Sequence, residues 1–400
     1  MAQYDFELAL ARELLSSGIT DVDLDLHPAP EKLQLAAAPG AKLGIPFPPG
    51  LAPVPQPINP APNPSAPLPP ADVLVVTWTV DEVGALADVH TPGFTKDHWY
   101  RYNRNYAQYD PQIRKGAPAK VAQRLGSYFP SKIGNKSVLL FKSELHLNQD
   151  SMETPPGSPG NATLPVKDLF HQLIDEVKPK IFLTTGTAGG VYAEQDLGDV
   201  AVTRGAKFRV KQEFRNAPFK NSVYKSDWNL PETQLAAAVQ LMANFKDKLA
   251  QPDELLPPTV SFTTPPGGYP KPSRPDTPDI WLDGQTVNGK VRMPKFHPIL
   301  TTDYFEYGTS KNRLDLEGCA VEMGDAVLGL CIEERKNSGR STPFWAVVRN
   351  CSDPQINGDL KDLPKSQSLQ VMWAVYYYKG YGYWTTVMSA LACWGIIAGL

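Results

Sequence analysis

Acidic side chains follow several apolar runs of this 400-residue chain, and carboxyl groups are the side chains best suited to acid–base chemistry. Asp81 and Glu82 follow the run VLVVT at 73–77, and Asp353 follows the run FWAVV at 344–348. A protonated carboxyl can deliver a proton to a leaving group while a second, ionised carboxylate handles the nucleophile. The sequence therefore contains the parts of an acid–base pair, provided that the fold brings them together.

A second acidic pair and a glycine-rich segment stand in comparable positions. Glu322 and Asp325, in GCAVEMGDAVLGLCIEER, open a predicted helix, where they would face a ligand or stabilise the helix N-terminus. The run IFLTT at 181–185 leads into GTAGG at 186–190, where small residues would let a ligand approach the backbone. Asp353 could instead belong to an ordinary Ser-Asp-Pro turn. Together, four strand ends with polar or glycine residues predict a site at one edge of a sheet.

The elements needed to hold these residues are buried strands with amphipathic helices between them. Continuous apolar runs, typical of strands covered on both faces, occur at 73–77, 137–141, 181–185, 199–203 and 344–348. Apolar residues at helical spacing predict helices over 165–178, 231–250 and 323–331. Strands that alternate with crossover helices predict an α/β fold, a three-layer α/β/α sandwich with a mixed, largely parallel central sheet.

Proline marks the organisation of the chain, since 40 of its residues are proline. They are concentrated in 28–70, which predicts a semi-rigid linker between a short amphipathic helix within 1–27 and a domain at 71–400. The N-terminal helix would either dock on a protein partner or strap onto the domain. Two stretches near 91–135 and 252–298 interrupt the strand–helix pattern, and we expect them to be insertions around the site.

Composition narrows the class of protein further. A net charge of −3 without a basic run excludes a nucleic-acid partner. The four cysteines form no CxxC pair, which favours free thiols in a cytoplasmic protein over disulfides or zinc. The N-terminus lacks the pattern of a secretory signal. The uncharged segment 383–400 is short for a membrane span and favours a buried last helix, with a tail anchor as the alternative.

The motifs GTAGG, LGDVAVT, AVEMGDA and VVRNCSD occur in this order after a DVLVVT strand that leads into DEV. This set resembles the nucleoside phosphorylase and nucleosidase superfamily over roughly residues 71–400. It includes the purine nucleoside and uridine phosphorylases, and the motifs are most similar in style to methylthioadenosine/adenosylhomocysteine nucleosidases. The resemblance implies cleavage of the N-glycosidic bond of a purine nucleoside or nucleotide, by water or phosphate. It also implies a homo-oligomer that needs no metal or organic cofactor.

The resemblance also implies roles for individual residues. Asp353 would protonate or hydrogen-bond N7 of the purine, and Glu82 would orient the attacking water. Phe305 would stack on the base, and Met323 would pack against the ribose. The complete set of implied substrate-binding residues is Thr187, Ala188, Gly189, Phe305, Glu322, Met323, Asp325 and Ser352.

The sequence departs from the family pattern in two places. The family motif VEMEA contains a second glutamate that grips the ribose hydroxyls, whereas this chain has Gly324 followed by Asp325. A changed sugar, a substitute role for Asp325 or a loss of activity would each account for the difference. No arginine set of a phosphorylase follows the first strand, which favours hydrolysis, with Arg104, Lys142 and His146 as candidate binders of a substrate phosphate. A phosphate-dependent phosphorylase and a catalytically weakened nucleoside- or nucleotide-sensing domain are the alternatives.

Overall fold

The computed structural model describes residues 43–147, 150–249, 278–284, 286–287, 290–309, 312–355 and 369–400. The predicted helix within 1–27, the first part of the proline-rich segment and most of the second predicted insertion lie outside the described residues.

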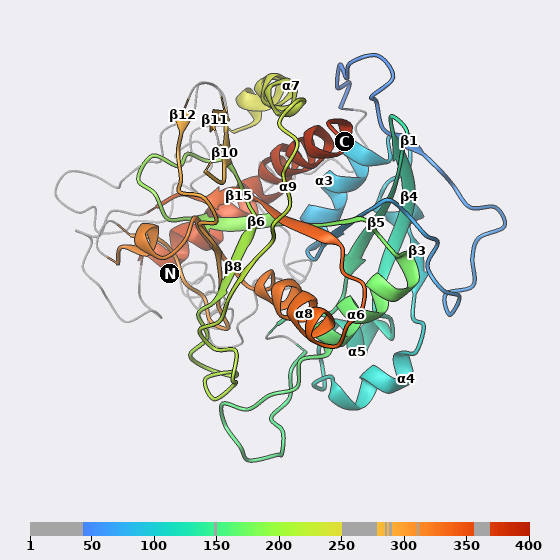
Figure 1. The fold of residues 1–400 in the computed structure, drawn as a ribbon, viewed down its shortest axis with the longest axis vertical. Helices are drawn as coiled ribbons and strands as arrows, with labels where there is room; N and C mark the ends of the chain where they lie inside the picture. The colour runs from blue at the N-terminus through green and yellow to red at the C-terminus, as the bar shows by residue number, and fades with distance from the viewer. Residues whose placement is uncertain are drawn as a thin grey trace, which may run out of the picture.

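Parallel strands form the centre of a mixed sheet (Figure 1). In spatial order they are β5 (Lys136–Ser143), β2 (Val73–Thr77), β6 (Ile181–Gly190) and β15 (Phe344–Asp353). Because these four strands are parallel, their carboxyl ends meet at one edge of the sheet. The strands predicted from the apolar runs are therefore confirmed. However, β6 and β15 each continue five residues beyond the predicted run, since the small residues after Thr185 still pair with Arg349 to Asp353.

The remaining strands extend the sheet on both sides. Beyond Thr184, β14 replaces β2 as the neighbour of β6 and runs antiparallel to it, with Val321 opposite Gly189. Beyond β5 lie β4 (Gly126–Ile133), β1 (Val54–Pro55) and β3 (Tyr100–Tyr102). Beyond β6 lie β14 (Ala320–Glu322), β13 (Ile299–Thr301), β8 (Gly205–Phe208) and β9 (Val223–Lys225). Beside β15 lie β7 (Val200–Thr203) and then β10 (Ile280–Leu282). A separate pair is formed by β11 (Thr286–Val287) and β12 (Lys290–Val291). The predicted insertion at 91–135 thus supplies β3 and β4 of the sheet.

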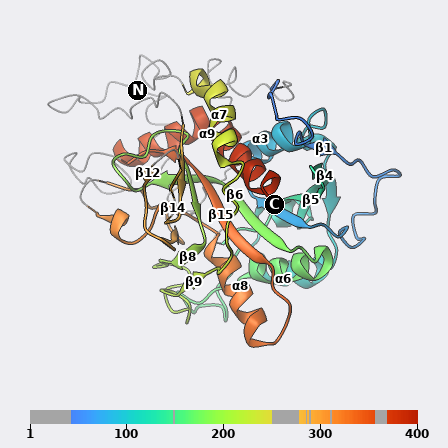
Figure 2. The same ribbon diagram turned by 45° about the horizontal axis from the view of Figure 1, so that its top comes forward.

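Helices cover both faces of the sheet (Figure 2). One layer consists of α3 (Val80–His90), α7 (Leu235–Met242) and α9 (Leu369–Ala398), and the other of α6 (Pro165–Val177) and α8 (Ala326–Asn337). Successive residues of a strand point to opposite faces. Accordingly, Val73 and Val75 pack in the core under the first layer, and Leu74 and Val76 in the core under the second. The predicted α/β/α sandwich is confirmed. Two further short helices, α4 (Tyr106–Tyr109) and α5 (Pro118–Ala122), belong to the segment of the chain between β3 and β4.

The last helix, α9, is part of the core. It packs against α3, α7, β6 and β15, and the side chains of Val387, Leu391 and Trp394 are fully buried. Among the residues that the structure describes, no helix has the length and apolar character that crossing a bilayer requires. For the segment 383–400, the sequence left a buried last helix and a tail anchor open, and the structure shows the buried last helix.

The described part of the proline-rich segment, 43–70, lies against the body of the protein. The ring of Phe47 is 5.1 Å from that of Trp394, whose Nε1 donates to the carbonyl of Leu51 at 2.7 Å. Strand β1 pairs with β4, and Leu68 is buried in the core. The prediction of a semi-rigid linker is therefore corrected for 43–70, because apolar side chains between the prolines pack onto the domain.

Candidate active site

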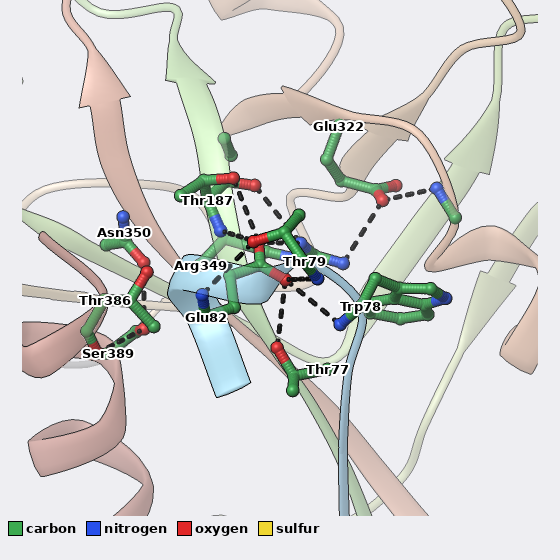
Figure 3. A network of polar contacts seen from close by, with 12 residues as sticks. Thr77, Trp78, Thr79, Glu82, Thr187, Glu322, Arg349, Asn350, Thr386 and Ser389 are labelled. Carbon is green, nitrogen blue, oxygen red and sulfur yellow. Dashed lines mark hydrogen bonds and ion pairs between the residues drawn. The ribbon is translucent and has the colours of Figure 1, made fainter. Parts of the chain in front are cut away.

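Glu82 lies at the carboxyl end of β2, in the first turn of α3. Its position three residues after Thr79 creates a capping box, in which each side chain accepts from the backbone N–H of the other. Oε2 accepts from Thr77 Oγ1 (2.9 Å), Trp78 N (3.0 Å) and Thr79 N (2.9 Å). Oε1 accepts from the N and Oγ1 of Thr187 on β6, at 2.7 and 3.0 Å (Figure 3). Five donors thus hold a carboxylate that is only 1% exposed.

Two glycines of β6 make room for carboxylates of the protein itself. Gly186 has φ of 149°, and a Cβ there would lie 2.2 Å from Glu82 Oε1. A Cβ at Gly189 would lie 2.8 Å from Asp353 Oδ2. The sequence predicted that a strand ends before this segment and that its small residues let a ligand approach the backbone. In the structure, 186–190 remain in β6, and the glycines admit Glu82 and Asp353. The approach of a ligand to this backbone stays a prediction.

Arg349 lies in the middle of β15 and is the buried cation of the site. Its Nε and Nη2 each donate to one carboxylate oxygen of Asp325 at 2.7 Å, which makes a bidentate pair. Nη1 donates to the carbonyl of Thr187 at 3.1 Å, and the indole of Trp78 lies 4.8 Å from the guanidinium carbon. Trp78 is in turn fixed by its Nε1, which donates to the carbonyl of Leu145.

Two further carboxylates approach the same guanidinium. Glu322 Oε2 lies 3.4 Å from Nη2, and Glu82 Oε1 lies 3.8 Å from Nη1 (Figure 3). Burial, followed by the charge of Asp325, raises the pKa of Glu322. Burial alone would lower the pKa of Arg349, but the carboxylates, led by Asp325, outweigh it and raise that pKa. The arrangement is therefore one permanent cation among three carboxyl groups.

Asp353 ends β15, opposite Gly189, as predicted for an acid at the carboxyl edge. Burial raises its pKa to about 7, and the hydrogen bond that Ser352 Oγ donates to Oδ1 at 2.8 Å offsets this only in part. Four residues of extended chain, about 13 Å, separate it from Arg349. Asp353 can thus hold its proton near neutral pH, and it lies away from Arg349 and the three carboxyl groups around that arginine.

Of the second acidic pair, only Asp325 stands at the start of the predicted helix, contrary to the prediction for Glu322. Glu322 ends β14, and its carboxylate accepts from Thr301 Oγ1 and from the backbone N–H groups of Gly324 and Asp325. Asp325 is the N-cap residue of α8, yet its side chain caps no helical N–H and pairs with Arg349 instead. A Cβ at Gly324 would lie 3.4 Å from Trp78 Cζ2, so the indole borders the position where this chain departs from the family motif.

The other predicted substrate-binding residues lie on the same edge. Ala188, which is buried, accepts from Ser352 Oγ through its carbonyl at 3.4 Å. Met323, half-buried, follows Glu322. Phe305, also half-buried, lies after β13 in a segment whose Gly308 closely approaches the backbone of Gly190. These contacts place the residues at the site edge, and their binding of a substrate stays a prediction.

Of the three candidate phosphate binders, Lys142 and His146 lie close enough to interact electrostatically, whereas Arg104 lies elsewhere. Arg104 pairs with Glu176 at 3.1 Å, in the last turn of α6, which leads to the amino end of β6 and therefore away from this edge. Lys142 lies at the carboxyl end of β5 but pairs with Glu144. His146 is buried, and burial, followed by the charge of Lys142, lowers its pKa to about 3. The described arrangement thus separates Arg104 from the other two candidates, and binding of a substrate phosphate by Lys142 and His146 stays a prediction.

Sequence reasoning missed Arg349 and Trp78. An arginine directly after the apolar run FWAVV is the signal that could have found Arg349, because a buried charge requires a partner. No spacing rule identifies Trp78. Among the described residues, no group of three or more histidine, cysteine, aspartate or glutamate side chains is arranged to hold a metal ion.

No family model matches the chain, and no curated protein matches it. Similar solved structures include the 5'-methylthioadenosine/S-adenosylhomocysteine nucleosidase of Neisseria meningitidis with methylthio-immucillin-A, at 13% identity and a TM-score of 0.42, covering 82% of this chain and 99% of that one. The futalosine hydrolase of Helicobacter pylori has 12% identity and a TM-score of 0.41, covering 82% and 97%. The S-adenosylhomocysteine nucleosidase of Streptococcus pyogenes with 5-methylthiotubericidin has 14% and 0.42, covering 83% and 98%. Similarity at this level assigns no activity, which depends on the residues described above.

Proposed function

We propose that this protein is a nucleosidase that cleaves the N-glycosidic bond of a purine nucleoside or nucleotide, with water as the nucleophile. The observation that carries the proposal is Asp353, a buried carboxyl with its pKa raised to about 7, at the same sheet edge as a second, ionisable carboxylate, Glu82. Two of the three similar solved structures reported above are nucleosidases by name.

The leaving group in this reaction is the purine, which departs more easily when its N7 is protonated. A carboxyl with an ordinary pKa would be ionised at neutral pH and could not supply that proton. Burial of Asp353 provides the protonated form. The proposal assigns Asp353 as the general acid and Ser352 as the residue that orients it.

The second requirement is a carboxylate that orients water and accepts its proton. The proposal assigns this role to Glu82, whose Oε1 lies between Thr187 and Nη1 of Arg349. When the C1'–N bond breaks, its electron pair goes to the base, the water oxygen bonds to C1', and the water proton goes to Glu82. Glu322, Met323 and Gly324 would border the sugar, and Thr187, Ala188, Gly189 and Phe305 the base.

The tight binding of Glu82 by the protein also supports a second candidate function. Five donors occupy this carboxylate in the structure. If they remain in place with ligand bound, water would not be activated, and the domain would bind a nucleoside or nucleotide without cleaving it.

Base release separates the two candidates. The protein is incubated with adenosine, inosine, guanosine and their 5'-monophosphates, and the free base is quantified by chromatography while binding is measured by calorimetry. The proposal expects base release that needs no phosphate and that falls as pH rises past about 7, because Asp353 then loses its proton. Binding of a nucleoside without base release would favour the sensing domain, and neither binding nor release would reject both.

A further inference from the structure

We propose that Asp325 determines which nucleophile the site accepts: by occupying the guanidinium of Arg349, it excludes phosphate and leaves water. This inference rests on the proposed function, which it deepens by assigning the acceptor specificity to one residue.

The first argument is the occupancy of Arg349. An arginine binds phosphate best through two parallel N–H groups of its planar fork. Nε and Nη2 of Arg349 form such a pair, and both donate to Asp325 at 2.7 Å. Nη1 donates to the carbonyl of Thr187, and one face of the guanidinium is covered by Trp78. The edge of the guanidinium that would bind an anion most strongly is therefore already paired with Asp325.

The second argument is the local charge. One cation, Arg349, is shared by three carboxyl groups, those of Glu82, Glu322 and Asp325. Even with Glu322 protonated, two negative charges face one positive charge. An incoming phosphate would meet net repulsion where water screens little, whereas a neutral water molecule would not.

The third argument is that Asp325 has no other evident task. It stands at the N-cap of α8, but its side chain accepts from none of the helical N–H groups. It is 0% exposed, and its two oxygens receive the two donors of Arg349. Asp325 is thus a positioning residue, and it acts on the reaction through Arg349.

The two reactions differ in the nucleophile whose oxygen bonds to C1' and in the proton that water must lose. In hydrolysis, a water oxygen bonds to C1' and its proton passes to Glu82, which yields free sugar. In phosphorolysis, a phosphate oxygen bonds to C1' and yields sugar 1-phosphate. In both, the C1'–N electron pair goes to the base, which receives its proton from Asp353. The sugar product therefore reports which nucleophile the site has used.

The test compares the full-length wild type with Asp325→Asn, an isosteric change that removes the charge and one of the two acceptors. Inorganic phosphate is the probe, and the readouts are the shift in melting temperature with phosphate, calorimetric affinity, and the sugar product. We expect wild type to release free sugar at a rate that phosphate does not raise. Asp325→Asn should bind phosphate at least about tenfold more tightly, the scale of one regained charge-assisted hydrogen bond.

Asp283→Asn is the matched control, since Asp283 is a buried aspartate that pairs with Arg204 at 3.1 Å. It should lower stability without raising phosphate affinity. Asp325→Ser provides a smaller replacement if the asparagine variant does not fold, and it should show the same gain. Sugar 1-phosphate from wild type, or equal phosphate affinity in wild type and a folded Asp325 variant, would overturn the inference. Absence of base release from every chain, together with the gain in phosphate affinity, would reject the proposed function and retain the anion exclusion.

Discussion

At the scale of single residues, the surroundings of each carboxyl determine which chemistry it can perform. Asp353 is buried against Gly189 and accepts a hydrogen bond from Ser352, which does not offset burial, so its neutral form is favoured. Glu82, which is also buried, receives hydrogen bonds from five donors, so its charge is compensated. Two carboxyls at one sheet edge are thereby suited to opposite roles.

We expect Asp353→Asn to reduce base release by about 10²–10⁴-fold, because an amide cannot donate the proton that N7 requires. The measurement is kcat for base release, with circular dichroism as the check on folding. Asp199→Asn is the matched control, since burial also raises the pKa of Asp199 to about 7 while its side chain accepts from Asp279 N and Trp281 Nε1. Wild-type kcat in Asp353→Asn would remove Asp353 from the mechanism.

Gly324 provides a second prediction at this scale. Gly324→Ala should change the free energy of unfolding by less than about 1 kcal/mol, because its Cβ would make ordinary contacts with Trp78 and Glu322. Gly324→Glu should be less stable than Gly324→Gln by at least about 1 kcal/mol, because it adds a charge beside existing carboxylates. Chemical denaturation measures all three. Equal stability of the Glu and Gln variants, or faster cleavage of ribonucleosides by Gly324→Glu, would mean that the site has room for a further carboxylate.

Sequence patterns predicted the position of Asp353, since acids after buried strands collect at one edge. They could not predict the pairing of Asp325 with Arg349, because the partners are 24 residues apart and belong to different elements. Local rules instead suggested helix capping for Asp325, and tertiary contact with a buried arginine prevailed over that preference.

At the scale of elements, glycine and proline explain where sequence reasoning placed boundaries wrongly. Glycines usually end strands, so β6 was expected to end before 186–190. In the structure, β15 supplies partners for these residues and extends the strand. Prolines predicted a linker through 28–70, yet the apolar residues between them bind part of this segment to the domain. In both cases, strand pairing or core packing between distant parts of the chain outweighed the local conformational preference of glycine or proline.

Leu68→Ala tests whether 43–70 belongs to the folded domain. Leu68 is 3% exposed within the core under α6 and α8, so the truncation should lower the free energy of unfolding by about 2–5 kcal/mol. Urea denaturation measures the loss. Val54→Ala, at a position 52% exposed in the same segment, should change stability by less than about 0.5 kcal/mol. Equal, small effects of both variants would show that the segment behaves as a linker.

At the scale of the whole molecule, several buried carboxyls make stability depend on pH in an unusual direction. Burial raises the pKa of Asp150, Asp199 and Asp353 to about 7 each, and raises that of Glu322. The folded protein therefore holds protons that the unfolded chain, with carboxyl pKa values near 4, has already released. Such groups stabilise the fold at low pH, and their contribution is lost as pH rises through the folded pKa.

We expect the free energy of unfolding to fall between about pH 6.5 and 8, by about 1.4 kcal/mol per pH unit for each proton held only in the folded state. The buried His90 and His146, with pKa values lowered to about 4 and about 3, oppose this only below about pH 6.5, where the unfolded chain protonates them. Urea denaturation across this range provides the measurement. Asp199→Asn should make the decline shallower, and stability that rises with pH would contradict the prediction.

The position of α9 has a consequence for the order in which this protein can fold during synthesis. The ribosome releases β2, β5 and β6 long before α9, yet α9 covers the face of the sheet that these strands help to form. Trp394 also completes the contacts of Phe47 and Leu51, more than 300 residues earlier in the chain. Until α9 emerges, the growing polypeptide exposes that apolar face to solvent and to chaperones, so this helix layer closes only after residues 369–398 have been synthesised.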